Sequence, residues 1–117
     1  MSKETIAEEV LRLLSPIPED EFIVLRLTDG ESKCCVIGHY ERLMSRNPSD
    51  YSIVNCGMKN CVQNRLIQAS SEFLFEKFGT YTNNIVTVNN AETKYYPQPI
   101  IKDRVIAVLK DMIKAGY

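Results

Sequence analysis

Residues 60–78 read NCVQNRLIQASSEFLFEKF, and this stretch decides the fold class. Its apolar side chains recur every three or four residues, which is the spacing of one face of an α-helix. Gly79 follows at once and is placed to end the helix, because glycine adopts a left-handed backbone without strain. The stretch predicts a long core helix over 60–78 with an apolar stripe of Val62, Leu66, Ala69, Phe73 and Leu74.

Three other segments share this helical spacing. The first covers residues 4–15 and ends at Ser15-Pro16-Ile17-Pro18, because proline cannot continue a helix. The second covers residues 33–45, with Ser32 placed as its cap. The last closes the chain, with Gly116 beyond it, and has a stripe of Ile101, Val105, Val108, Leu109 and Met112.

Two short segments have the composition of strands. Residues 22–27 are rich in aliphatic side chains and are followed by the turn signal Thr28-Asp29-Gly30. Residues 85–88, Ile-Val-Thr-Val, are β-branched throughout and have asparagines on both sides. The sequence therefore predicts a helix-dominated α+β fold, with about four helices and one or two short strands in a single domain over 1–117.

Composition and charge restrict the class of protein. The chain has 117 residues, 44% of them hydrophobic and 25% charged, as in an ordinary globular domain. It has neither a long apolar run nor a signal peptide at its start, so we expect a cytoplasmic protein that makes no membrane contact. Residues 1–31 hold eight acids and three bases, hence −5, and the remainder holds seven acids and eleven bases, hence +4. This mild asymmetry gives no reason to expect nucleic acid as a partner.

The cysteines and the single histidine are the residues whose chemistry could build a site. Cys35 and His39 are one helical turn apart, and Cys56 and Cys61 could complete four metal ligands. Cys34 and Cys35 also fall in the predicted first turn of a helix, where a thiolate is favoured. Against this, the spacings are not those of a zinc knuckle, and free cysteine commonly packs as a small hydrophobic residue. Metal binding, thiol chemistry, disulfide pairing of the four cysteines and core packing therefore all remain open.

The loop between the second strand and the last helix is the candidate recognition surface. Tyr95 and Tyr96 precede two prolines, and tyrosine is favoured at binding surfaces because it is large, stiff and partly polar. Asn89 and Asn90 would present amide groups at the end of the predicted strand. The alternative is that the two tyrosines only pack the loop onto the domain.

The order of these motifs resembles a family of small bacterial proteins defined as a domain of unknown function. Cys35-Val36-Ile37-Gly38-His39 is similar to its Cys-x-x-Gly-Ala helix, Phe78-Gly79 to its Leu-Gly helix end, and Val88-Asn89-Asn90 to its Trp-Asn-Asp strand end. The chain departs from the family at His39, Val88 and Asn90. The resemblance implies an architecture and, since the family has no assigned activity, no reaction.

No phosphate-binding glycine loop or catalytic motif is found, so no cofactor is expected. We expect a non-catalytic binding or protein-interaction module, which contacts a protein partner or a second copy of itself. One alternative is a small metal-binding or thiol-dependent protein that uses Cys34, Cys35, His39, Cys56 and Cys61. Another is a mobile-element protein that inhibits a host factor.

Overall fold

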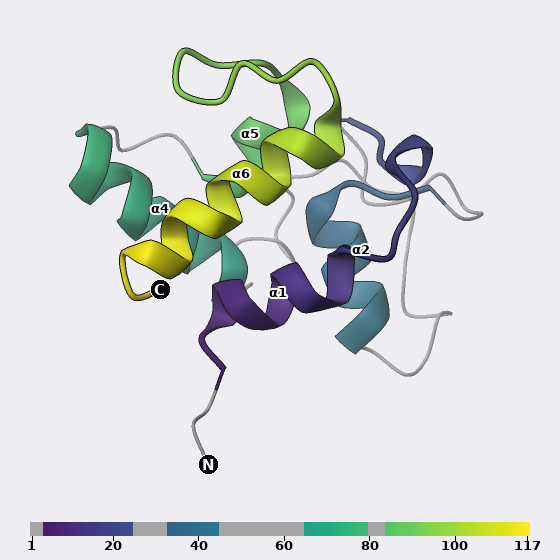
Figure 1. The fold of residues 1–117 in the computed structure, drawn as a ribbon, viewed down its shortest axis with the longest axis horizontal. Coiled ribbons are helices and arrows are strands. Elements are labelled where there is room, and N and C mark those ends of the chain that lie inside the picture. Colours follow the sequence, from purple (N-terminus) through teal and green to yellow (C-terminus); the bar gives the residue numbers. More distant parts are fainter. Residues whose placement is uncertain (1–3, 25–32, 45–64, 80–83) are drawn as a thin grey trace.

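The computed structural model describes residues 4–24, 33–44, 65–79 and 84–117. Within these ranges the only β-type pairing is an isolated parallel bridge between Phe22 and Cys34. The described part of the chain is therefore all-α, and the predicted α+β class is wrong. Its elements are α1 (Ile6–Leu14), the short 3-10 helix η1 (Glu19–Glu21), α2 (Val36–Met44), α4 (Arg65–Phe78), α5 (Ile85–Asn90) and α6 (Ile101–Lys114) (Figure 1).

Helix α5 occupies the segment for which the sequence predicts a strand. Its first turn is capped twice: Asn84 Oδ1 accepts a hydrogen bond from the Val86 N–H at 2.7 Å, and Ser70 Oγ on α4 accepts one from the Ile85 N–H at 2.9 Å. Ile85 and Val88 are buried in the core. β-Branched residues favour strands only weakly, so capping and packing override the preference here.

The other predicted strand is not formed in its described part. Phe22 makes the isolated bridge, and the Ile23 N–H donates to the Cys34 carbonyl at 3.0 Å. Residues 25–27 lie outside the described residues, as does Ser32, the predicted helix cap. This short contact nevertheless fixes the chain after η1 against the start of α2.

The predicted helices are confirmed where the structure describes them. Helix α1 begins with a capping box, in which Thr5 and Glu8 exchange side-chain and backbone hydrogen bonds at 2.9 and 3.2 Å. Helix α2 begins at Val36, three residues later than predicted, and residues 60–64 of the predicted core helix lie outside the described ranges. Helix α4 ends as expected at Gly79, whose φ is +73°.

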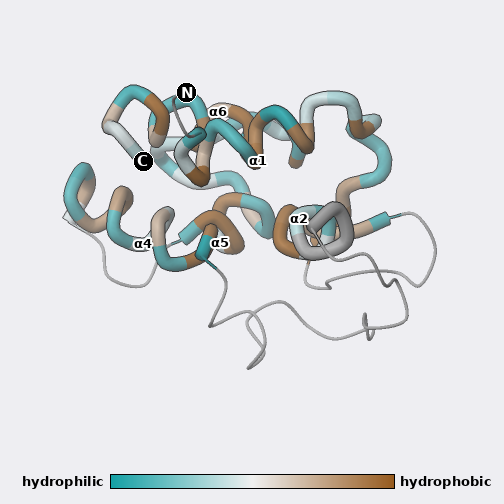
Figure 2. The backbone as a smooth tube through the Cα atoms, turned by 90° about the horizontal axis from the view of Figure 1, so that it is seen from below, coloured by the Kyte–Doolittle hydropathy of each residue, from teal (hydrophilic) through white to brown (hydrophobic). Residues whose placement is uncertain are grey.

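The helices form two layers with the core between them. Figure 2 shows α1 and α6 in one layer and α2, α4 and α5 in the other. The described residues include no helix that is both long enough and apolar enough to cross a membrane. The largest fully buried side chains come from both layers and include Val10, Leu14, Ile37, Leu66, Phe73, Ile85, Val105, Leu109 and Met112.

Candidate functional site

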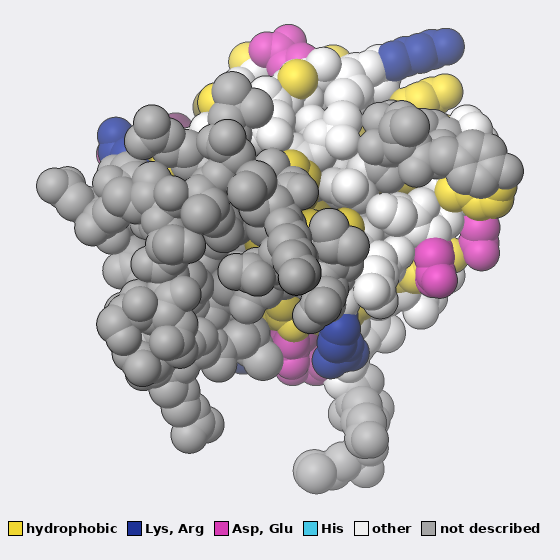
Figure 3. Space-filling view, turned by 180° about the vertical axis from the view of Figure 1, so that it is seen from behind, with side chains coloured by type: hydrophobic (Ala, Val, Ile, Leu, Met, Phe, Trp, Pro, Cys, Tyr) yellow, Lys and Arg dark blue, Asp and Glu magenta, His cyan; other side chains and the backbone are white. Residues whose placement is uncertain are grey.

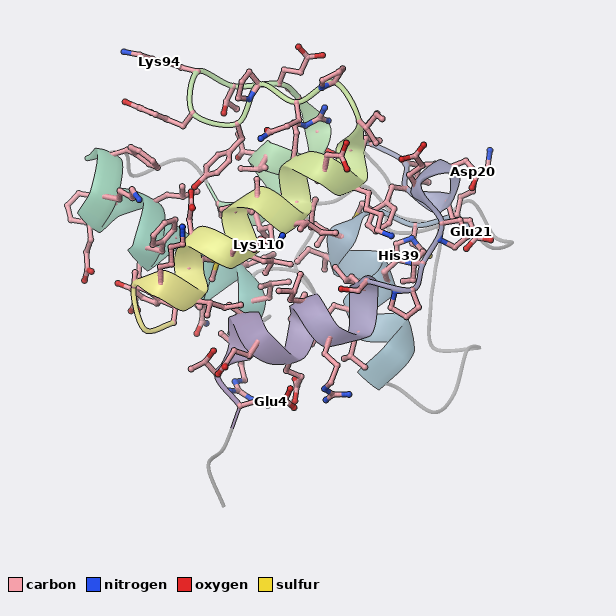
Figure 4. The ribbon with its side chains drawn as sticks, viewed as in Figure 1. Glu4, Asp20, Glu21, His39, Lys94 and Lys110 are labelled. Carbon is pink, nitrogen blue, oxygen red and sulfur yellow. The ribbon has the colours of Figure 1, made fainter. Side chains whose placement is uncertain are left out.

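The described part of the cysteine and histidine cluster lies in a buried corner, where η1 meets the start of α2. Cys34 and Cys35 are buried, with exposed fractions of 1% and 0%. His39 is buried, with its ring centroid 4.6 Å from that of Phe22. Its Nε2 donates to the backbone carbonyl of Glu21 at 2.8 Å, since a carbonyl can only accept (Figure 4 labels both residues). This ring nitrogen therefore carries a hydrogen, and in the neutral ring the lone pair is on Nδ1.

The predicted metal set stays a prediction, since half of it is not among the described residues. Cys56 and Cys61 lie outside them, and within them no three histidine, cysteine or acidic side chains are grouped closely enough to hold an ion. Cys35 and His39 do lie one helical turn apart, because the His39 N–H donates to the Cys35 carbonyl at 2.9 Å. Both side chains are buried, so neither is presented to solvent in this corner.

Asn89, predicted as a binding residue, joins three segments in the interior. Its side chain is fully buried, and Oδ1 accepts from the Val36 N–H at 2.9 Å, which caps the first turn of α2 from outside that helix. Its Nδ2 donates to the Ile23 carbonyl at 2.9 Å and to Asn90 Oδ1 at 3.1 Å. Asn89 is thus committed to holding the fold, and half-buried Asn90 contributes to the same network.

The two adjacent tyrosines have opposite environments. Tyr96 is buried, and its hydroxyl donates to Asp111 Oδ2 on α6 at 2.8 Å. The pKa of the Tyr96 hydroxyl is raised, mainly because the group is buried and secondly because it donates this hydrogen bond. Tyr96 and Thr93 also bond to each other twice, each at 3.0 Å, which closes a tight turn around Lys94 and Tyr95. Tyr96 therefore packs the loop onto the domain, as the alternative interpretation predicts.

Tyr95 lies on the surface, and Phe78 at the end of α4 packs against it. The two rings are stacked, with centroids 3.7 Å apart and planes inclined by 17°. Tyr95 remains 44% exposed, and Phe78 is half-buried. We call this stacked pair the aromatic platform. Of the four residues predicted to bind, Tyr95 is the one that is exposed in the structure.

Two lysines accompany the aromatic platform. Lys77 Nζ lies 5.8 Å from the centroid of the Phe78 ring, and Lys94 Nζ lies 5.7 Å from that of Tyr95. In Figure 4, Lys94 extends away from the body of the molecule, and Figure 3 shows a basic side chain beside hydrophobic ones at this edge. These distances are within the range of cation–π attraction, and the ammonium groups keep their capacity to bind anionic groups.

Sequence reasoning missed three residues of this region: Lys77, Phe78 and Lys94. It used Phe78 only as the end of a helix. The signal that could have found them is the pairing of a terminal aromatic and lysine on α4 with a second lysine and aromatic, Lys94-Tyr95, in the following loop.

Comparisons with protein-family models, with curated proteins and with solved structures each found no match to this chain. The resemblance to the bacterial family therefore stays a prediction. Its strand end is corrected, because Val88-Asn89-Asn90 forms the last turn of helix α5.

Proposed function

We propose that this chain is a non-catalytic protein-interaction module and that the aromatic platform is its contact surface. The observation that carries the proposal is the stacked, exposed Tyr95 on a loop that is fixed to the domain on both sides of it. Aromatic residues are enriched where proteins bind each other, because they offer a large contact area with few rotatable bonds.

Pre-organisation of the loop supports this function. Its turn is closed by the mutual bonds of Thr93 and Tyr96, and Tyr96 is anchored to Asp111. Pro97 and Pro99 restrict the backbone that follows. A surface that is already ordered loses little conformational entropy when a partner binds, so more of the contact energy is available as affinity.

The chemistry of the platform favours a particular kind of partner segment. Two ammonium groups lie within 6 Å of its rings. Glu76, the acid beside Lys77, is directed elsewhere, since its Oε2 accepts from the Tyr117 hydroxyl. The partner we infer is a peptide segment in which an aromatic or branched apolar side chain has carboxylates beside it. The apolar group would contact the rings, and the carboxylates would pair with Lys77 and Lys94.

A random peptide library displayed on phage tests the proposal. The immobilised chain should enrich peptides that combine apolar and acidic residues. Tyr95→Ala should weaken the affinity for the best selected peptide by about tenfold or more, because a central aromatic contact is removed. Replacing Lys77 and Lys94 with glutamine should weaken it by less and should reduce its dependence on salt.

Val24→Ala is the matched control, since Val24 is a similarly exposed apolar residue at 39% and lies after η1, away from the platform. Affinity should be unchanged in this variant. The absence of enrichment over bare support, or equal binding by Tyr95→Ala and the original chain, contradicts the proposal. Analytical ultracentrifugation of the chain alone tests whether the partner is a second copy of the same chain. In that case the chain should form a dimer that Tyr95→Ala weakens.

A further inference from the structure

Arg104, in the first turn of α6, is the one aspartate, glutamate, lysine or arginine that is buried within residues 4–24, 33–40, 65–79 and 84–117. Its side chain is only 3% exposed. Ion pairing does not explain this burial, because the ion pair found in the described ranges is the exposed one between Arg12 and Glu4. Removing a guanidinium from water without a carboxylate partner is costly, so its hydrogen bonds must provide the compensation.

Those hydrogen bonds go to four backbone carbonyls at the two ends of one loop. Nε donates to the Val88 carbonyl at 2.7 Å, and Nη2 donates to that of Asn89 at 2.8 Å. Nη1 donates to the Gln98 carbonyl at 2.8 Å and to the Pro99 carbonyl at 3.1 Å. One planar group therefore joins the end of α5 to the end of the loop 91–100, which carries Tyr95.

Only arginine suits this position. The last carbonyls of a helix have no partner within the helix, and a cation near them is favourable. The guanidinium presents its donors in a rigid planar fork that reaches several acceptors at once, whereas a lysine ammonium is a single compact point. The four carbonyls are thus satisfied by one side chain in one orientation.

We propose that Arg104 is a positioning residue for the aromatic platform. It holds both ends of the loop 91–100 together and thereby keeps Tyr95 stacked on Phe78. This role rests on the proposed function, because positioning the platform matters only if the platform binds a partner. The stacking itself can be measured without any partner. Arg104 and Asp111 both lie on α6, so this helix fixes the loop at its ends and at Tyr96.

The test is NMR of the free chain with labelled aromatic rings. The original chain should show nuclear Overhauser contacts between the Tyr95 and Phe78 rings, and Arg104→Met should lose them. Arg104→Lys keeps the charge but not the fork, so it should lose most of their intensity. Lys102→Met is the matched control: Lys102 lies on the same helix and also donates to a backbone carbonyl, but that carbonyl belongs to Ser15, outside the loop, at 2.7 Å.

Val108→Ala controls for general destabilisation, because it truncates a fully buried side chain of α6 and leaves a cavity in the core. This variant should retain the ring contacts. The proposal is overturned if both Arg104 variants keep them, or if Val108→Ala loses them to the same extent. Should Arg104→Met not fold, Arg104→Lys alone decides between these outcomes.

Measuring peptide affinity separates the positioning role of Arg104 from the proposal that the aromatic platform binds a partner. Arg104→Lys should weaken the affinity for the selected peptide by about threefold to tenfold, because the loop must then be ordered when the peptide binds. If the ring contacts disappear while affinity for the peptide is unchanged, Arg104 does position the platform, and the platform is not the binding surface.

Discussion

The buried corner between η1 and α2 and the loop 91–100 both contain residues with useful chemistry, but they use it differently. In the corner, His39 bonds to a backbone carbonyl and the thiols of Cys34 and Cys35 are enclosed. In the loop, Tyr96 is committed inward whereas Tyr95 and Lys94 remain exposed. The difference teaches that residue type indicates which chemistry is available, whereas burial and hydrogen bonding decide whether it is already used by the fold.

The strongest test of the corner is Asn89→Ala. This change leaves the Val36 N–H and the Ile23 carbonyl without their partner and opens a cavity beside them. We expect the free energy of unfolding to fall by about 3–5 kcal/mol, since each unsatisfied buried group costs about 1–3 kcal/mol. Urea unfolding followed by circular dichroism measures the loss. Asn90→Ala, on the half-buried neighbour, should cost less than about 1 kcal/mol, and equal losses in the two variants would contradict the assigned role.

The second prediction concerns the thiols of the corner. Cys34 and Cys35 should react with a thiol reagent at least about a hundredfold more slowly in the native chain than in urea, because they become accessible only when the structure opens. Peptide mapping by mass spectrometry separates them from Cys56 and Cys61, since trypsin cuts after Arg42 and Arg46, which lie between Cys35 and Cys56. Rapid labelling of the native chain at Cys34 or Cys35 would contradict the conclusion that the corner, unlike the loop 91–100, keeps its reactive groups enclosed.

A smaller effect is expected from Tyr96→Phe, which removes the hydroxyl bond to Asp111. The cost at neutral pH should be about 1 kcal/mol. The pKa of Tyr96 is raised in the folded chain, so its contribution is complete below the usual pKa of 10.0 and is lost as the pH rises above it. The stability difference between the original chain and the variant should therefore narrow above pH 10, by at most about 1.4 kcal/mol per pH unit. Thermal unfolding at a series of pH values measures this trend, and a difference that widens has the wrong sign.

The smallest change in stability is expected from Tyr95→Ala. Tyr95 is 44% exposed, so losing its ring should lower the free energy of unfolding by less than about 1 kcal/mol, even though we expect the same change to weaken peptide binding. Chemical unfolding compares the stability of this variant with that of Tyr96→Ala, in which a buried side chain is removed. A comparable loss from both would mean that Tyr95 is a packing residue like its neighbour.

Local patterns predicted the helices but not the contacts between them. The stripe that begins at Ile101 identifies α6, yet α5 is misread as a strand because its β-branched residues favour one, and two of the three residues that cap it, Ser70 and Arg104, are distant in sequence. Arg104 left a detectable trace, since it falls on the apolar stripe of its helix, where a charge is unexpected. No local signal distinguishes Tyr95 from Tyr96. Their environments differ because Tyr95 stacks on Phe78 at the surface, whereas the Tyr96 hydroxyl bonds to Asp111.

Asn89 also has a consequence for the order of folding. Its bonds to Val36 and Ile23 span 53 and 66 positions of the chain, so both need long stretches to be brought together first. We expect these bonds to form after the rate-limiting step and so to act mainly on the unfolding rate. In stopped-flow experiments, Asn89→Ala should shorten the lifetime of the native chain far more than it delays refolding. One amide would then determine how long the folded molecule persists rather than how quickly it forms.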